Sequence, residues 1–224
     1  MQAFGISGRA GEAAAPRSRR TANTLFWAAL IPTAATVGGF LSQYPYGMLW
    51  VGVLIVLAAA ATGPIVAGSV WNRAGAATLV GFSLLALGLF AGSNLNETYM
   101  KQLGERTGAV VVEAGERVSA KGDVRHFCRV VDGSGSRAEL GDIQNCHGQF
   151  TTGQRVVLFE DRLGGLDPWI EATDDRGVDP LGLGITAGLY ALTAAALVYA
   201  GQRRRTDRES ARPRRARAGR AGPP

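Results

Sequence analysis

Two cysteines and two histidines are the residues whose types and spacing could support chemistry in this chain. They form two short clusters, His126-Phe127-Cys128 and Cys146-His147. Two thiolates and two imidazoles can hold zinc in a tetrahedral site. However, adjacent residues such as Cys146 and His147 point to opposite faces of a strand. We therefore expect a disulfide between Cys128 and Cys146 and no bound metal, with His126 and His147 kept as the alternative metal ligands.

Sequence motifs of known enzyme classes do not occur in the chain. It contains no G-x-S-x-G, no H-E-x-x-H, no P-loop and no dinucleotide fingerprint. Asp123 and His126 could form a dyad, but no serine is required to lie beside them. The acidic stretch from Glu171 to Asp179 does not follow the pattern of a calcium-binding loop. We expect no catalytic residues, no cofactor and no enzymatic activity.

Four long apolar segments flank the part of the chain that contains the cysteines and histidines. They cover residues 24–41, 48–70, 74–92 and 181–200, and none of them contains a charged residue. Each is close to the roughly 20 apolar residues that cross a bilayer as a helix. A helix is the one open-chain structure that satisfies every backbone polar group in lipid. The predicted fold class is a membrane protein with four transmembrane helices, and we interpret the first segment as an uncleaved helix.

Basic residues predict the orientation of these helices. The arm at 1–23, the turn containing Arg73 and the tail at 201–224 are basic, whereas residues 93–180 carry more acidic than basic side chains. Lys and Arg accumulate on the cytoplasmic side of a membrane. We therefore expect a multi-pass plasma-membrane protein with both termini in the cytoplasm, a disordered Arg-rich tail and an outer domain at 93–180.

The outer location also bears on the cysteines. Both Cys128 and Cys146 fall in the segment assigned to the oxidising side, where disulfides form and persist. In the chain-entropy model, closing the loop between them contributes about 3 kcal/mol.

The outer segment shows the short alternating runs that are typical of strands. Such runs occur at 108–115, 123–132, 155–161 and 168–173, with a weaker one at 137–140. Glycine-rich turns separate them, which predicts a small antiparallel β-domain, with an OB-like barrel as one form of it. Before them, a polar stretch from Ser93 extends the third helix or serves as a linker.

One stretch of this segment, TGQRVVLFEDRLGGLDPWIEA, carries a resemblance. It resembles the closing strands of the extracytoplasmic β-domain in uncharacterised small multi-pass membrane proteins of high-GC bacteria. In those proteins a Gly-x-Arg-Val strand leads into an acidic turn, a glycine and an Asp-Pro. The matching residues are Gly153, Arg155, Val156, Asp161, Gly165, Asp167 and Pro168. The resemblance implies a β-domain ahead of a final transmembrane helix, and it implies no activity.

Our leading hypothesis is a non-enzymatic membrane anchor that presents the outer β-domain for partner binding or sensing in the envelope. Coupled transporters place ionisable residues inside the membrane, and these helices contain none. One alternative is a channel or exporter component formed by oligomerised helices. Another is an outer-face metal-dependent enzyme or metal carrier that uses His126 and His147.

The expected partners follow from the same features. They are the lipid bilayer and either a second copy of the chain or an envelope protein, and no nucleic acid. Glycines spaced four apart, at Gly88 and Gly92 and at Gly184 and Gly188, suit close helix packing within the chain or between copies.

Overall fold

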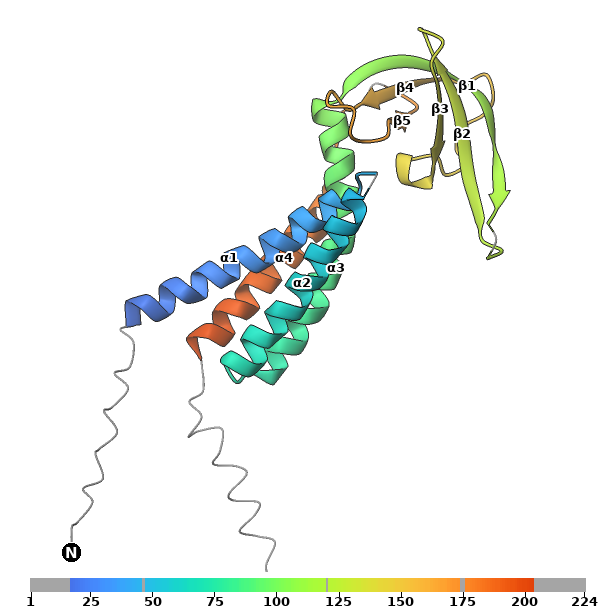
Figure 1. The fold of residues 1–224 in the computed structure, drawn as a ribbon. Helices are drawn as coiled ribbons and strands as arrows, with labels where there is room; N and C mark the ends of the chain where they lie inside the picture. The colour runs from blue at the N-terminus through green and yellow to red at the C-terminus, as the bar shows by residue number, and fades with distance from the viewer. Residues whose placement is uncertain (1–16, 46, 120, 174–175, 204–224) are drawn as a thin grey trace, which may run out of the picture.

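A helical bundle carries a curled β-sheet domain at one end (Figure 1). The computed structural model describes residues 17–203, apart from 46, 120 and 174–175. Most of the basic arm and nearly all of the tail therefore lie outside the described residues, and the expected disorder of the tail stays a prediction.

Four helices form the bundle. They are α1 (Arg17–Leu41), α2 (Met48–Ile65), α3 (Ala74–Leu103) and α4 (Pro180–Gln202). Each is long and apolar enough to cross a membrane. The prediction of four long apolar helices is therefore confirmed. Of the two alternatives for the polar stretch from Ser93, the structure has the helical extension: α3 continues through it to Leu103 and leaves the bundle as a stalk (Figure 1).

A π-helical turn, Val66–Val70, links α2 to α3. The amide of Trp71 donates to the carbonyl of Val66, one residue further back than in an α-helix. Asn72 then adopts a left-handed conformation with φ 55°, which Asn tolerates better than most residues. This geometry reverses the chain and leaves Arg73 at the start of α3.

Close backbone contacts hold α1, α2 and α3 together. A Cβ at Gly88 would lie 2.5 Å from Cγ1 of Val56, and one at Gly92 would lie 2.7 Å from the carbonyl oxygen of Gly39. The first predicted glycine pair is thus used inside the chain. A buried hydrogen bond of 2.8 Å from Thr193 to Ser83 joins α4 to α3.

The β-domain is a five-stranded antiparallel sheet curled into a half-barrel. Its strands are β1 (Glu105–Val118), β2 (Val124–Asp132), β3 (Arg137–Gly141), β4 (Arg155–Glu160) and β5 (Trp169–Glu171). The order across the sheet is β3-β2-β1-β4-β5. The predicted antiparallel sheet is confirmed, and the weaker run forms β3.

The long strand β1 is the centre of the sheet. Its first half pairs with β4 and its second half with β2, with a bulge between Val111 and Glu113. A bulge bends the strand and increases its twist, which helps the sheet to curl. The edges β3 and β5 remain unpaired with each other, and the inner face holds an apolar core that includes Val130, Leu140 and Ile170.

Substitution of Gly39 by alanine should destabilise the bundle. A Cβ at Gly39 would collide with the backbone carbonyl of Gly88, which cannot move aside without separating α1 from α3. Overpacking of this kind costs about 1–3 kcal/mol. We expect a lower thermal midpoint, measured by circular dichroism in detergent. Gly188→Ala is the matched control because nothing lies within 4 Å of a Cβ there, and equal losses in the two variants would contradict the packing argument.

Candidate functional site

The disulfide fastens a loop across the open side of the half-barrel. Cys128 on β2 is bonded to Cys146, with Cα atoms 6.1 Å apart, and both side chains are fully buried. Asn145 then donates from Nδ2 to the carbonyl of Ile170 on β5 at 2.9 Å. Since η2 (Asp142–Gln144) directly follows β3, this loop bridges the gap between the two edge strands.

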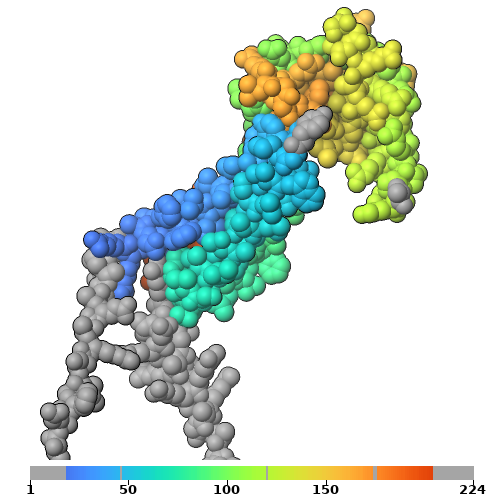
Figure 2. All heavy atoms as spheres, viewed as in Figure 1, coloured from blue at the N-terminus to red at the C-terminus, as the bar shows by residue number. Residues whose placement is uncertain are grey.

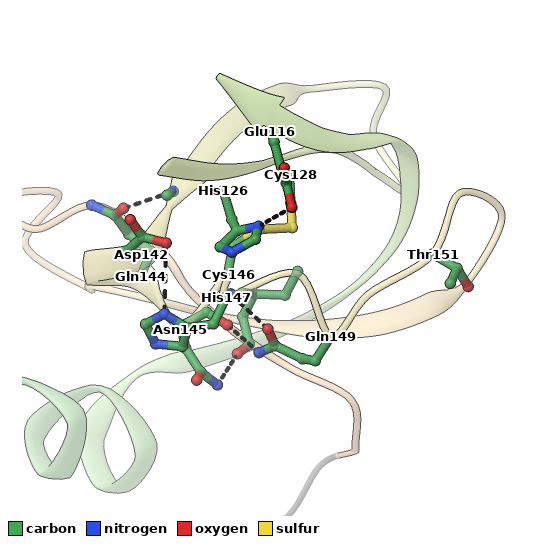
Figure 3. Close-up of a disulfide and its surroundings, with 12 residues drawn as sticks. Glu116, His126, Cys128, Asp142, Gln144, Asn145, Cys146, His147, Gln149 and Thr151 are labelled. Atoms are coloured by element: carbon green, nitrogen blue, oxygen red, sulfur yellow. Dashed lines mark hydrogen bonds and ion pairs between the residues drawn. A yellow bond between two sulfur atoms is a disulfide. The ribbon is translucent and has the colours of Figure 1, made fainter. Parts of the chain in front are cut away.

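The histidines lie near this disulfide but face different partners (Figure 3). Nδ1 of His126 is 3.8 Å from Oε1 of Glu116, and Nδ1 of His147 is 3.6 Å from Oδ1 of Asp142. Within the described residues, no group of three or more His, Cys, Asp or Glu side chains gathers around one point. Both sulfur atoms are used in the disulfide, so the four residues do not form the tetrahedral set that their clustering in the sequence suggested.

Other polar residues that the sequence singled out contribute to the fold and do not form a catalytic or metal site within the described residues. The carboxylate beside His126 is that of Glu116 on β1, and no ion pair between His126 and Asp123 occurs among the described residues. In the acidic stretch before α4, Asp179 caps that helix by accepting from the amides of Leu181 and Gly182, both at 2.9 Å.

The outer face of the sheet presents an aromatic ring between two arginines. Phe127 points away from the core because its neighbours on β2 point inward. The guanidinium carbons of Arg117 and Arg129 lie 5.0 and 5.7 Å from the centre of its ring, within cation–π range. Gly115 is the residue opposite Phe127 on β1. A Cβ there would lie 3.2 Å from the ring, so the glycine makes room for Phe127.

Ion pairs cross three strands beside this ring. Arg129 on β2 donates to Glu113 on β1 at 2.6 Å and to Glu139 on β3 at 3.0 Å. Arg117 lies 3.1 Å from the second oxygen of Glu139. The hydrogen bond from Arg129 lowers the pKa of Glu139, and the same bond raises the pKa of Arg129. The pairs hold both guanidinium groups in fixed orientations around Phe127.

A shallow groove of about 550 Å³ lies beside these pairs. Its lining combines small apolar side chains with charged ones, namely Val112, Glu113, Arg129, Val130, Val131, Arg137, Ala138 and Glu139. We call this groove together with Phe127 and Arg117 the Phe127 surface. It offers an aromatic ring, apolar contacts and oriented charges on one exposed face.

Lys101 attaches the β-domain to α3. Its Nζ lies 2.8 Å from carboxylate oxygens of both Glu97 on α3 and Glu171 on β5, and it donates to the carbonyl of Gly177 at 3.2 Å. The indole nitrogen of Trp169 donates to the same Glu171 at 3.0 Å. Lys101 is therefore a buried cation bound by α3, the last strand and the segment that leads into α4.

Asp161 provides a second attachment. Tyr99 on α3 donates to it at 2.8 Å, and the amides of Leu163, Gly165 and Leu166 donate at 3.2, 2.9 and 3.2 Å. Burial of the carboxyl acts to raise its pKa. The hydrogen bonds outweigh this effect, so the pKa of Asp161 lies below its ordinary value.

Apolar contacts complete the junction. Met100, Phe159, Leu166 and Trp169 form a buried cluster. Tyr44 of the α1–α2 turn packs against this cluster, and Figure 2 shows this turn in contact with the segment that contains β4 and β5. The domain is thus seated on the end of the bundle as well as tied to α3.

Sequence reasoning named Asp161 and Gly165 only as part of an acidic turn, and it did not find Lys101 or the junction itself. The spacing of Glu97 and Lys101, four apart on a helix, was one usable signal. The outward position of Phe127 also follows from strand alternation once Cys128 is placed in the core. The contact between Lys101 and Glu171 joins residues far apart in the sequence and carries no local signal.

The chain matches no protein-family model, no curated protein and no solved structure. The resemblance of its closing strands to those of small bacterial membrane proteins therefore stays a prediction.

Replacing both cysteines by alanine should reduce the stability of the β-domain by about 3 kcal/mol, because the loop across its open side is no longer fastened. Urea unfolding followed by proteolysis of the segment between α3 and α4 would measure this loss. A reductant should produce a similar loss in the native chain and none in the variant. Equal stability of the oxidised native chain and the variant would contradict a structural role for the bond.

Acid should weaken the junction through Asp161. Because its pKa is lowered in the folded state, its contribution is present above the unfolded pKa of about 3.9 and is lost as the pH falls through the folded value. Thermal midpoints between pH 7 and 3 should fall less steeply for Asp161→Asn than for the native chain. Asp123→Asn, at the exposed β1–β2 turn, serves as the control and should retain the native slope. Equal slopes in all three proteins would rule out this role of Asp161.

Proposed function

We propose that this chain is a multi-pass plasma-membrane protein that holds its β-domain outside the cytoplasm and binds an envelope partner through the Phe127 surface. The observation that carries the proposal is the ring of Phe127 between two oriented arginines, on a domain fixed to the membrane bundle through Lys101 and Asp161.

The arrangement of the helix ends supports the orientation. The start of α1 and the end of α4 lie at the end of the bundle opposite the β-domain (Figure 1). Arg19, Arg20, Arg73 and Arg203 belong to that end. Because basic residues favour the cytoplasmic side, both termini are assigned to the cytoplasm and the β-domain to the outside.

The composition of the Phe127 surface supports binding. Aromatic residues and arginine are enriched where proteins bind partners. The ion pairs among Glu113, Arg129, Glu139 and Arg117 are exposed, and exposed pairs contribute little to folding. They do restrict the side chains before a partner arrives, which reduces the entropy lost on binding.

The topology of the sheet also supports binding at the face that carries the Phe127 surface. We interpret the half-barrel as an open OB-like fold, because a long bulged β1 pairs with both β2 and β4 and leaves β3 and β5 at the edges. OB-folds bind oligonucleotides and oligosaccharides on the face of their second and third strands, so this face of the fold can serve as a binding surface. Phe127 and Arg129 on β2 and Glu139 on β3 occupy that face.

In-cell photo-crosslinking from Val112 tests this function. A photoreactive amino acid at Val112, which is exposed and lines the groove, should capture an envelope protein. Phe127→Ala should weaken that capture at least about tenfold, because loss of a central aromatic anchor commonly costs 2 kcal/mol or more. Disulfide formation in the variant shows that the domain still folds.

Ile143 provides the matched site. It is exposed on η2 and does not line the groove of the Phe127 surface, so a photoreactive residue there should not capture the same protein. Capture of nothing but further copies of the chain, or equal capture from Val112 and Ile143, would contradict the proposal.

A further inference from the structure

Two arginines meet at the end of the bundle that lies away from the β-domain. Nε of Arg73, at the start of α3, donates to the backbone carbonyl of Arg203, just after α4, at 2.7 Å. The guanidinium carbon of Arg203 lies 5.3 Å from the centre of the Tyr199 ring. The π-helical turn and the left-handed Asn72 place Arg73 in this position.

A pocket of about 480 Å³ opens beside Arg73. It is lined by Asn72, Arg73, residues 74–76 and Tyr199, and we call it the Arg73 pocket. A Cβ built on Gly75 would have nothing within 4 Å. Within the part of the chain that the structure describes, the space above the first turn of α3 can therefore take a ligand.

The charge of the Arg73 pocket is uncompensated within the described residues. No salt bridge there joins Arg73 or Arg203 to a carboxylate. Arg19 and Arg20 at the start of α1 add further positive charge to this end of the bundle. The guanidinium group of Arg73 in the lining, together with that of Arg203 over the ring of Tyr199, favours an anion, and a planar guanidinium fork matches the oxygens of a phosphate.

The position of the pocket selects the source of that phosphate. It lies where the apolar part of α3 begins, at the depth of lipid headgroups. Val70, which precedes the turn, is 61 % exposed, and Tyr199 is 50 % exposed. These side chains offer apolar surface to acyl chains, which a free phosphate ion would leave unused. Basic pockets between transmembrane helices commonly bind lipid headgroups.

We propose that the Arg73 pocket binds the headgroup phosphate of an anionic phospholipid. Arg73 and Arg203 contact the phosphate oxygens, and the amides of the first turn of α3 supply further donors. Val70 and Tyr199 lie along the upper part of the acyl chains. This site does not depend on the proposed role of the Phe127 surface.

Native mass spectrometry of the full chain in detergent tests the proposal. The probes are phosphatidylglycerol and phosphatidylcholine at equal concentration, and we expect a saturable preference for phosphatidylglycerol. Arg73→Gln keeps a donor for the carbonyl of Arg203 but removes the charge. It should weaken phosphatidylglycerol binding about tenfold, as expected for the loss of a charge-assisted hydrogen bond.

Gly75→Glu is a second variant that should fold normally. The glutamate enters free space in the first turn of a helix, where a carboxylate is favourable, and it neutralises the Arg73 pocket. It should abolish the lipid preference while the thermal midpoint in phosphatidylcholine stays at or above that of the native chain.

Arg20→Gln is the matched control, because it removes one exposed arginine from the same end of the bundle. It should change phosphatidylglycerol binding less than twofold. An equal loss in Arg20→Gln and Arg73→Gln would overturn the site in favour of diffuse surface charge. Equal binding of the two lipids, or displacement of phosphatidylglycerol by millimolar inorganic phosphate, would also overturn it.

Discussion

A lysine removed from water must keep its counter-charges, and this requirement fixes the β-domain on the bundle. Lys101 is 9 % exposed and shared between Glu97 on α3 and Glu171 on β5. Removing a carboxylate partner while the charge of Lys101 stays buried costs several kcal/mol, so the packed junction requires both glutamates beside the lysine. Asp161 imposes the same condition from the turn after β4 through Tyr99. The relative placement of sheet and bundle therefore depends on charge satisfaction as well as on the apolar cluster between them.

This placement determines which surfaces of the domain are free. The turn between β4 and β5 is occupied by the junction, and the loop that carries Cys146 closes the gap between β3 and β5. The outer face of β1, β2 and β3 stays open, and it is there that Phe127 and its arginines lie. An OB-like domain that was not attached to other elements would expose several surfaces at which a partner could bind. Attachment to the helical bundle leaves the outer face of β1, β2 and β3 as the main exposed face, which is why we propose that the partner binds there.

The sequence predicted those features that depend on local composition. Uncharged apolar runs gave the four helices, and alternation gave all five strands. For the polar stretch after residue 92 the sequence left two alternatives, an extension of the third helix or a linker, because apolarity marks the apolar part of a helix and not the residue at which a polar helix ends. The pairing of β1 with both β2 and β4 could not be predicted, since it depends on contacts between distant residues. The same is true of Lys101, whose partner Glu171 lies on another element.

For the site, the sequence predicted the cysteine pair, whereas the partners of the two histidines could not be predicted from it. Neighbouring residues of a strand point to opposite faces. Because Cys128 points into the core, the ring of Phe127 must point outward. No local rule shows that His126 meets Glu116 across the hairpin while His147 meets Asp142 in the loop. The side chains that define the Phe127 surface come together only when β1, β2 and β3 pair in the correct register. The groove therefore depends on strand pairing and cannot be predicted from any one strand.

One helix connects the two proposed sites. With 30 residues, α3 is about 45 Å long, whereas the hydrocarbon core of a bilayer is about 30 Å thick. The surplus of about 15 Å corresponds to the polar stalk, so in the proposed membrane orientation Lys101 would lie outside the lipid. Arg73 stands at the opposite end of the same helix, which contains no proline to bend it. A phospholipid held at Arg73 would fix the depth of α3 in the bilayer. Because the β-domain is tied to the other end through Lys101, that depth would also set the height of the Phe127 surface above the membrane.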